Sequence, residues 1–246
     1  MMTSTIRVAA AQTYEIIGDA SKATSVVIDL VNQSKAAGAS LICFPEAFLQ
    51  GYVCEKAHVE REALSTESRE FRTLLNDLPE NSPTVVLGFI EAIAGGYANS
   101  AAIIQSRKAI ACYRKSHLLK RESIFSTGDA YPVFEVDGLR FGVIICNDAN
   151  FPETARSMRE QSAELLVCCA NNMFPLDTAE QWKNQHNAIR SERCRETGMW
   201  LLSSDVTGHR DECVALGPTS LIAPSGEVVH QLPLNEPGLL IANITI

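Results

Sequence analysis

Hydrophobic residues recur along this chain with two alternating periods, one typical of strands and one typical of helices. Residues 6–12 form an apolar run that predicts a first strand, and residues 20–37 predict an amphipathic helix. Other strands are predicted at residues 41–44, 84–90, 100–105, 109–114, 133–136, 139–146, 165–170, 200–204, 219–223 and 228–231, and other helices at residues 62–78, 152–161 and 179–197. This alternation predicts a mixed α/β fold in which helices cover sheet faces.

Turn residues divide these elements without marking a second domain. Asp137-Gly138 joins two predicted strands as a hairpin, and the segment from Pro224 to Glu227 joins another pair. No repeat, low-complexity segment or flexible linker interrupts the pattern. We therefore expect residues 1–246 to form a single domain, and the periodicity leaves open whether its strands form one sheet or two.

The composition is typical of a globular protein with an acidic surface. The 246 residues are 46% hydrophobic and carry a net charge of -8. Such a surface disfavours nucleic acid and anionic membranes as partners. No apolar run approaches the ~18 residues of a membrane span, and the N-terminus lacks the apolar core of a signal peptide. These features predict a cytoplasmic protein.

The eight cysteines do not follow the spacing of a metal site. Several lie inside apolar runs, where a thiol behaves as a small hydrophobic side chain. Cys168 and Cys169 are neighbours in a predicted strand, so their side chains point to opposite faces. Packing explains this pair better than redox chemistry.

Cys146 differs from the other cysteines because it ends an apolar strand and precedes the Pro-Glu start of a predicted helix. A thiol in that position is a candidate nucleophile, but it is mostly protonated at neutral pH and needs a base. Histidine is the usual base for cysteine. No sequence typical of papain-like proteases surrounds Cys146, however, so the five histidines are weak candidates.

Two other strand ends supply a carboxylate and an ammonium. Glu46 follows a Phe-Pro dipeptide, where burial would raise the pKa of its carboxyl group toward that of a general base. Lys115 follows a Tyr-Arg dipeptide, and its ammonium is suited to stabilising an oxyanion and favouring a thiolate. Together with Cys146, these residues suggest thiol chemistry on a carbon-nitrogen bond.

The three segments, in this order and over nearly the whole chain, resemble the nitrilase superfamily of carbon-nitrogen hydrolases. The F-P-E, Y-R-K and C-x-D-x-x-F-P-E motifs of that family match the sequences that contain Glu46, Lys115 and Cys146. The resemblance implies that these residues form a Glu-Lys-Cys triad. It also implies that Cys146 attacks a carbonyl carbon to form a thioester, with no metal or other cofactor.

The same resemblance extends to a fourth residue and to the fold. A second glutamate of the family precedes an F-x-x-G-D stretch, and here Glu122 precedes residues 125–129. Its implied role is to orient the lysine and the substrate amide. The family resemblance further implies a four-layer α-β-β-α sandwich that pairs into a homodimer or a larger homo-oligomer.

Candidate substrate contacts are Asn147, Asn172, Met173, Phe174 and Asp205. The resemblance places the segment that follows the strand at residues 165–170 along the pocket, and it places the Ser-Asp-Val-Thr-Gly segment near it. Asp205 would meet an amine or a polar tail of the substrate. A turn aspartate is nevertheless the more ordinary interpretation of that residue.

The residues after Cys146 limit the substrate class. The Cys-Asn-Asp sequence is similar to that of N-carbamoyl-D-amino-acid hydrolases, which place two arginines next to grip a carboxylate; here Ala149 and Asn150 stand in those positions. We therefore predict hydrolysis of a small neutral or amine-bearing amide to an acid and ammonia. One alternative is an N-carbamoyl amine hydrolase that releases CO2 and ammonia. A non-enzymatic alternative is a binding module that keeps the fold.

The remaining conspicuous polar residues have ordinary interpretations. Arg190, Arg193 and Arg195 belong to a predicted helix with interspersed glutamates, which is typical of a solvated or dimer-facing surface. Asp148 and Glu153 are expected to organise the turn after Cys146 and to cap the next helix.

Overall fold

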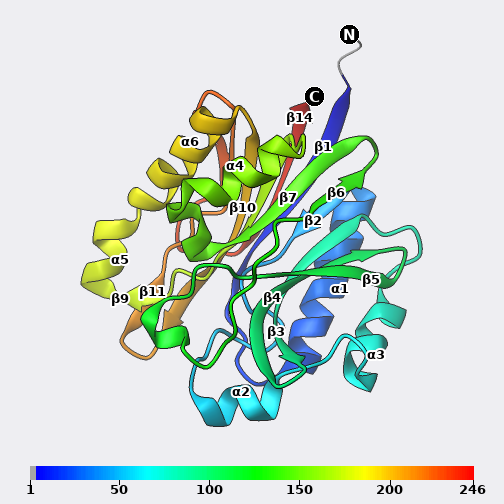
Figure 1. The fold of residues 1–246 in the computed structure, drawn as a ribbon, viewed down its shortest axis with the longest axis vertical. Helices are drawn as coiled ribbons and strands as arrows, with labels where there is room; N and C mark the ends of the chain where they lie inside the picture. Colours follow the sequence, from blue (N-terminus) through cyan, green and yellow to red (C-terminus); the bar gives the residue numbers. More distant parts are fainter. Residues whose placement is uncertain (1–3) are drawn as a thin grey trace.

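In the computed structural model, which describes residues 4–246, the main strands form one curled sheet (Figure 1). Its order is β5-β4-β3-β2-β1-β10-β8-β7-β6. These strands are β1 (Thr5–Tyr14), β2 (Leu41–Cys43), β3 (Thr84–Ile93), β4 (Gly96–Gln105), β5 (Lys108–Arg114), β6 (Val133–Val136), β7 (Leu139–Ile145), β8 (Leu165–Cys169) and β10 (Trp200–Arg210). Because β1 pairs in parallel with both β2 and β10, the two halves of the sheet are continuous.

Helices and shorter strands complete the chain. The helices are α1 (Ala20–Ala36), α2 (Lys56–Glu62), α3 (Arg69–Asp77), α4 (Pro152–Glu160), α5 (Leu176–Trp182) and α6 (Gln185–Thr197), with 3₁₀ turns at Lys120–Glu122 and Cys146–Asn150. The shorter strands are β9 (Phe174–Pro175), β11 (Cys213–Ala215), β12 (Ser220–Ile222) and β13 (Val228–Gln231), and β14 (Gly238–Thr245) runs antiparallel to β1.

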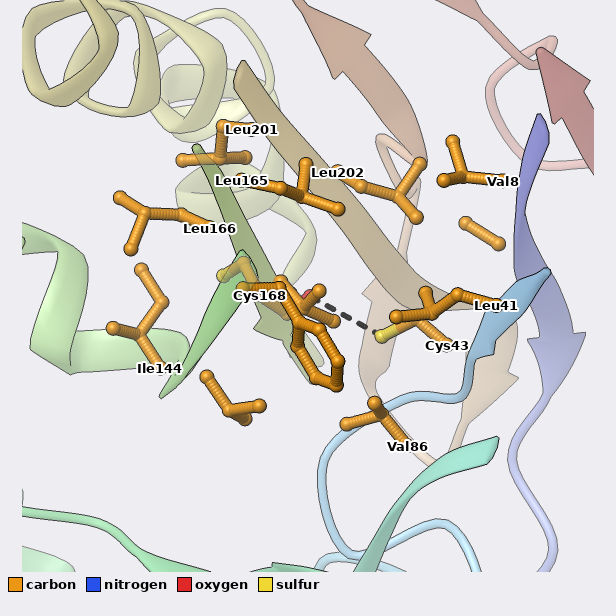
Figure 2. Packing of buried hydrophobic residues seen from close by; sticks show 14 of the residues in the cluster. Val8, Leu41, Cys43, Val86, Ile144, Leu165, Leu166, Cys168, Leu201 and Leu202 are labelled. Atoms are coloured by element: carbon orange, nitrogen blue, oxygen red, sulfur yellow. Dashed lines mark hydrogen bonds between the residues drawn. The ribbon is translucent and has the colours of Figure 1, made fainter. Parts of the chain in front are cut away.

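The curl of the sheet brings its two halves against each other. Strands β4 and β5 approach β7, and β2 and β3 approach β8. Apolar side chains from both halves fill the space between them; in Figure 2, Val8 and Leu41 of one half lie in the same cluster as Ile144 and Leu202 of the other. Burial of this apolar surface is the main force that holds the halves together.

Helices cover the outer face of each half. Val27 and Val31 of α1 and Phe71 of α3 pack on the β1–β5 half, while Met158 of α4 and Cys194 of α6 pack on the other half. The result is helix, half-sheet, half-sheet and helix, which is the four-layer α-β-β-α sandwich that the resemblance implied. Among the described residues, no helix is long and apolar enough to cross a membrane.

Two of the predicted helices are wrong in their extent. The helix predicted at residues 62–78 corresponds to α3 alone, because Leu64 hydrogen-bonds with Ile90 and Ala92 of β3 and Ser68 caps α3. The helix α2, which ends at Glu62, was not predicted. The helix predicted at residues 179–197 is divided into α5 and α6 at residues 183–184. Both hairpins are confirmed, whereas β14 was not predicted.

Gly88 of β3 allows the turn that carries Glu46 to lie directly against the sheet. A Cβ atom added at Gly88 would lie 2.1 Å from the carbonyl oxygen of Pro45, 2.7 Å from the nitrogen of Ala47 and 2.9 Å from Cα of Glu46. All three are backbone atoms, which do not move aside as a flexible side chain does. Glycine is therefore required here for close approach rather than for a special φ angle.

We expect Gly88→Ala to lower the melting temperature, because the added methyl group must displace the Glu46 turn. Overpacking of this kind costs about 1–3 kcal/mol. Gly96→Ala is the matched control, since its added Cβ would meet only the Ser126 hydroxyl at 3.7 Å. Thermal unfolding measures the effect, and equal melting temperatures of the two variants would contradict this account of Gly88.

Candidate active site

Cys146 lies at the point where β7 ends and a 3₁₀ turn begins. Its φ angle of 45° is left-handed, which is uncommon for a residue other than glycine. The Asp148 carboxylate holds the turn in place: it accepts hydrogen bonds from the N–H groups of Ile145 (2.9 Å) and His117 (2.8 Å) and from the Tyr113 hydroxyl (2.8 Å). The predicted organising role of Asp148 is thus confirmed.

Lys115 lies between two carboxylates in a fully buried cluster. Its Nζ is 2.7 Å from Oε1 of Glu46 and 2.8 Å from Oε1 of Glu122, and none of the three side chains is exposed. Nδ2 of Asn99 donates to the same two oxygens. Oε2 of Glu46 has no hydrogen-bond partner within the described part of the chain. Glu46 therefore keeps one carboxylate oxygen available.

The two glutamates respond differently to this environment. Burial raises the pKa of Glu46, and Lys115 offsets the rise only in part. Burial acts on Glu122 in the same direction, but Lys115 and the N–H of Leu119 outweigh it, so the pKa of Glu122 is lowered. Burial would lower the pKa of Lys115, yet the negative groups around it raise that pKa above its usual value. Lys115 therefore stays protonated, and the raised pKa of Glu46 suits it to exchanging a proton.

The Cys146 thiol is not activated in the resting site. Burial and the negative charge of Glu46 raise the pKa of this thiol well above its usual value, and the Lys115 charge offsets only part of the rise. A protonated thiol is a poor nucleophile and needs a base when it reacts. The N–H groups of Ser116 and His117 donate to the Asp148 carboxylate, so the segment that follows Lys115 lies against the turn that carries Cys146.

Asn99 and Tyr52 contribute to the site but were not predicted. Asn99 is a buried amide on β4, which begins at Gly96, four residues before the predicted strand. A strand prediction that included residue 99 would have marked this amide as a buried polar residue. Tyr52 is buried, with its ring centroid 5.7 Å from Nζ of Lys115. It belongs to a loop, and no pattern in the sequence marks it.

A cavity of about 210 Å³ borders Cys146. The residues that line it are mostly uncharged: Leu119, Cys146, Asn147, Ala149, Asn150, Asn172, Phe174, Trp182, His186, Ile189 and Arg190. Burial, together with Arg190, lowers the pKa of His186 to about 3, so that imidazole is neutral at physiological pH. Within residues 4–246, no group of three or more His, Cys, Asp or Glu side chains is arranged to hold a metal ion.

The sequence profile of carbon-nitrogen hydrolases matches residues 7–246 of this chain. The chain belongs to the carbon-nitrogen hydrolase family. It is 29% identical over 203 residues to an (R)-stereoselective amidase from Pseudomonas sp, covering 82% of this chain and 72% of that protein. It is 28% identical over 245 residues to a nitrilase from Pyrococcus abyssi, covering 98% of this chain and 90% of that protein.

The fold of this carbon-nitrogen hydrolase is similar to that of an amidase from Nesterenkonia sp. The TM-score is 0.80 at 21% sequence identity, and the likeness covers 97% of this chain and 90% of the other. In a variant of the Nesterenkonia amidase, acrylamide is added at the active-site cysteine. The likeness establishes the shared fold.

The residues predicted to contact substrate fall into two groups in this hydrolase. Asn147, Asn172 and Phe174 border the cavity at Cys146. Met173 is 4% exposed and packs in a small apolar cluster instead, so its side chain is not part of the cavity lining. Asp205 is fully buried and does not line the cavity either.

Two interpretations of polar residues are wrong. Asp205 is not a turn residue, because it lies inside β10. Arg190 and Arg193 are only 3% and 4% exposed, so the predicted solvated surface holds for Arg195 and not for these two. Because α6 packs on the sheet, its inward-facing arginines pair within the chain: Arg190 with Asp205 (3.4 Å) and Arg193 with Glu196 (3.0 Å).

We expect Glu46→Gln to shift the pH dependence of Cys146 alkylation by iodoacetamide to lower pH, because removing the negative charge lowers the pKa of the thiol. Peptide mass spectrometry measures alkylation at this one cysteine. The exposed Glu67→Gln variant is the control and should match the unmodified protein. A midpoint of that pH dependence at higher pH in Glu46→Gln would contradict the charge effect assigned to Glu46.

Proposed function

We propose that the protein hydrolyses a small amide to a carboxylic acid and ammonia through a thioester on Cys146. In acylation, the thiol proton passes to Oε2 of Glu46 while sulfur attacks the carbonyl carbon. The Lys115 ammonium stabilises the oxyanion that forms. Glu46 then gives the proton to the leaving nitrogen, the C–N bond breaks and ammonia departs.

In deacylation the same groups act on water. Glu46 accepts a proton from water, the resulting hydroxide attacks the thioester carbon, and the C–S bond breaks. The sulfur recovers the proton from Glu46, which returns the site to its initial state. Glu122 stays ionised and orients Lys115 throughout the cycle.

The observation that carries the proposal is the buried, unpartnered Oε2 of Glu46, whose charge acts on the Cys146 thiol. A buried glutamate with a raised pKa and a free oxygen is suited to taking and returning one proton. Lys115 uses two contacts to hold the carboxylates. Since an ammonium has three N–H donors, one remains for the oxyanion.

The cavity favours a compact, uncharged acyl group. Its volume of about 210 Å³ exceeds that of an engineered cavity of roughly 150 Å³ that binds benzene. Of the described residues along its walls, Arg190 is the charged one, and its guanidinium already binds Asp205, Ser203 and Pro218. A substrate carboxylate would therefore find no free cation there. This supports the small neutral amide over an amide with an anionic tail.

An N-carbamoyl amine is the second candidate substrate. The chain is 26% identical over 242 residues to an N-carbamoylputrescine amidase from Arabidopsis thaliana, covering 88% of this chain and 79% of that protein. Measuring CO2 beside ammonia separates the two reactions, because an amide releases no CO2. A homodimer or larger homo-oligomer and a cytoplasmic location also remain predictions.

We expect the protein to release ammonia from short neutral amides and to act much more slowly on ω-amides that carry a carboxylate. Cys146→Ala should abolish turnover, and Lys115→Ala should slow it by on the order of 10²-fold, the usual scale for one lost oxyanion donor. Cys112→Ala is the control for loss of a half-buried thiol. Unchanged turnover in Cys146→Ala would exclude the thioester route.

The raised pKa of Glu46 predicts the acid side of the pH profile. Glu46 must be ionised to accept the thiol proton, so kcat/KM should fall as the pH drops through the pKa of Glu46, above the ordinary 4.5. Circular dichroism at each pH separates this loss from unfolding. An acid limb at or below 4.5 in the folded protein would rule out Glu46 as the base.

A further inference from the structure

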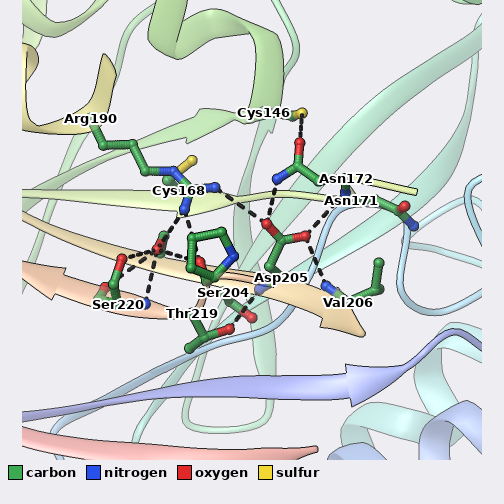
Figure 3. A network of polar contacts seen from close by, with 12 residues as sticks. Cys146, Cys168, Asn171, Asn172, Arg190, Ser204, Asp205, Val206, Thr219 and Ser220 are labelled. Atoms are coloured by element: carbon green, nitrogen blue, oxygen red, sulfur yellow. Dashed lines mark hydrogen bonds and ion pairs between the residues drawn. The ribbon is translucent and has the colours of Figure 1, made fainter. Parts of the chain in front are cut away.

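Asn172 hydrogen-bonds to Asp205, which forms a buried ion pair with Arg190 (Figure 3). Oδ2 of Asp205 accepts hydrogen bonds from Nδ2 of Asn172 and from Nη2 of Arg190, the latter at 3.4 Å. Oδ1 of Asp205 accepts from the N–H groups of Asn172 (3.1 Å) and Val206 (3.0 Å). Asp205 thus fixes both the backbone and the side chain of Asn172.

Arg190 anchors this arrangement in the sheet. Its Nη1 donates to the carbonyl oxygen of Pro218 at 2.9 Å and to the hydroxyl of Ser203 at 3.1 Å. The N–H of Asp205 donates to the Thr219 hydroxyl at 3.0 Å. These contacts come from α6, β10 and the buried segment before β12.

The orientation of the Asn172 amide follows from these contacts. Both oxygens of Asp205 already accept from N–H donors, so a flipped Asn172 would place its carbonyl oxygen against a carboxylate that needs a donor there. Burial raises the pKa of Asp205, and Arg190 opposes that rise. The amide nitrogen therefore points to Asp205, and Oδ1 points to Cys146, 3.8 Å from its Sγ.

We propose that Oδ1 of Asn172 accepts an N–H from the leaving nitrogen of the substrate and that Asp205 and Arg190 are positioning residues for this contact. The proposal rests on the proposed amide hydrolysis. In the resting site the thiol faces this oxygen. When the substrate N–H takes its place, the thiol is released to turn toward Oε2 of Glu46. The site then selects amides over esters, whose leaving oxygen carries no hydrogen to donate.

Comparison of an amide with the methyl ester of the same acid tests the proposal. Both substrates give the same thioester, so the ratio of their kcat/KM values isolates recognition of the leaving group. In Asn172→Ala we expect the amide-to-ester ratio to fall on the order of 10- to 100-fold, the scale for losing one hydrogen bond at a buried group. The kcat/KM value for the amide should fall by more than the value for the ester.

The double variant Asp205→Asn/Arg190→Met tests the positioning role and removes both buried charges together, because either single change leaves a buried ion unpaired. It should also lower the amide-to-ester ratio, while the control Arg195→Met, on the exposed side of α6, should not. If these residues had only a structural role, the double variant would lower kcat/KM equally for the amide and the ester.

An unchanged ratio in Asn172→Ala, with the wild type active on both substrates, would overturn the proposal and leave the amide hydrolysis standing. A wild type that cleaves neither substrate would overturn both. If only the double variant keeps the wild-type ratio, the positioning role of Asp205 and Arg190 is wrong.

Discussion

Burying Lys115 with two carboxylates is the constraint on which the rest of this structure depends. An ammonium and two carboxylates at full burial carry one negative charge too many if all are ionised, and a buried unpaired charge is costly. The two glutamates differ in their contacts, and their pKa values therefore shift in opposite directions. Glu122 receives the N–H of Leu119 and keeps its charge, whereas Glu46 keeps an unpartnered oxygen and a raised pKa. This imbalance suits Glu46 to the proton exchange that we propose for it.

The fold brings these charges together by curling one sheet on itself. Glu46 follows β2, Lys115 follows β5 and Cys146 follows β7, so the three residues come from both halves of the sheet. Backbone contacts also join the halves near the site: the N–H of Glu46 donates to the carbonyl oxygen of Ala170 at 3.1 Å. The packing between the halves therefore sets the geometry of the site, and a change in that core is transmitted to the chemistry.

The sequence predicted most strands and the helices α1 and α4, because their apolar periodicity and turn residues are local signals. It did not predict β14, and it joined α5 to α6, since two turn residues between helical patterns give little warning. The sequence motifs predicted Glu46, Lys115, Glu122 and Cys146 as the catalytic residues. Local sequence patterns did not predict the burial of residues whose hydrogen-bond partners lie far away in the sequence. The burial of Asp205 depends on Arg190 in α6, which no spacing reveals.

The most direct test of the central account is intact-protein mass spectrometry of the enzyme quenched in acid during turnover of a short neutral amide. The account predicts a species heavier than the free protein by the acyl group, with the added mass on the peptide that contains Cys146 and removed by hydroxylamine. An acyl group on another residue, or product formation with no acylated species even when a slowly hydrolysed acyl group is used, would contradict it.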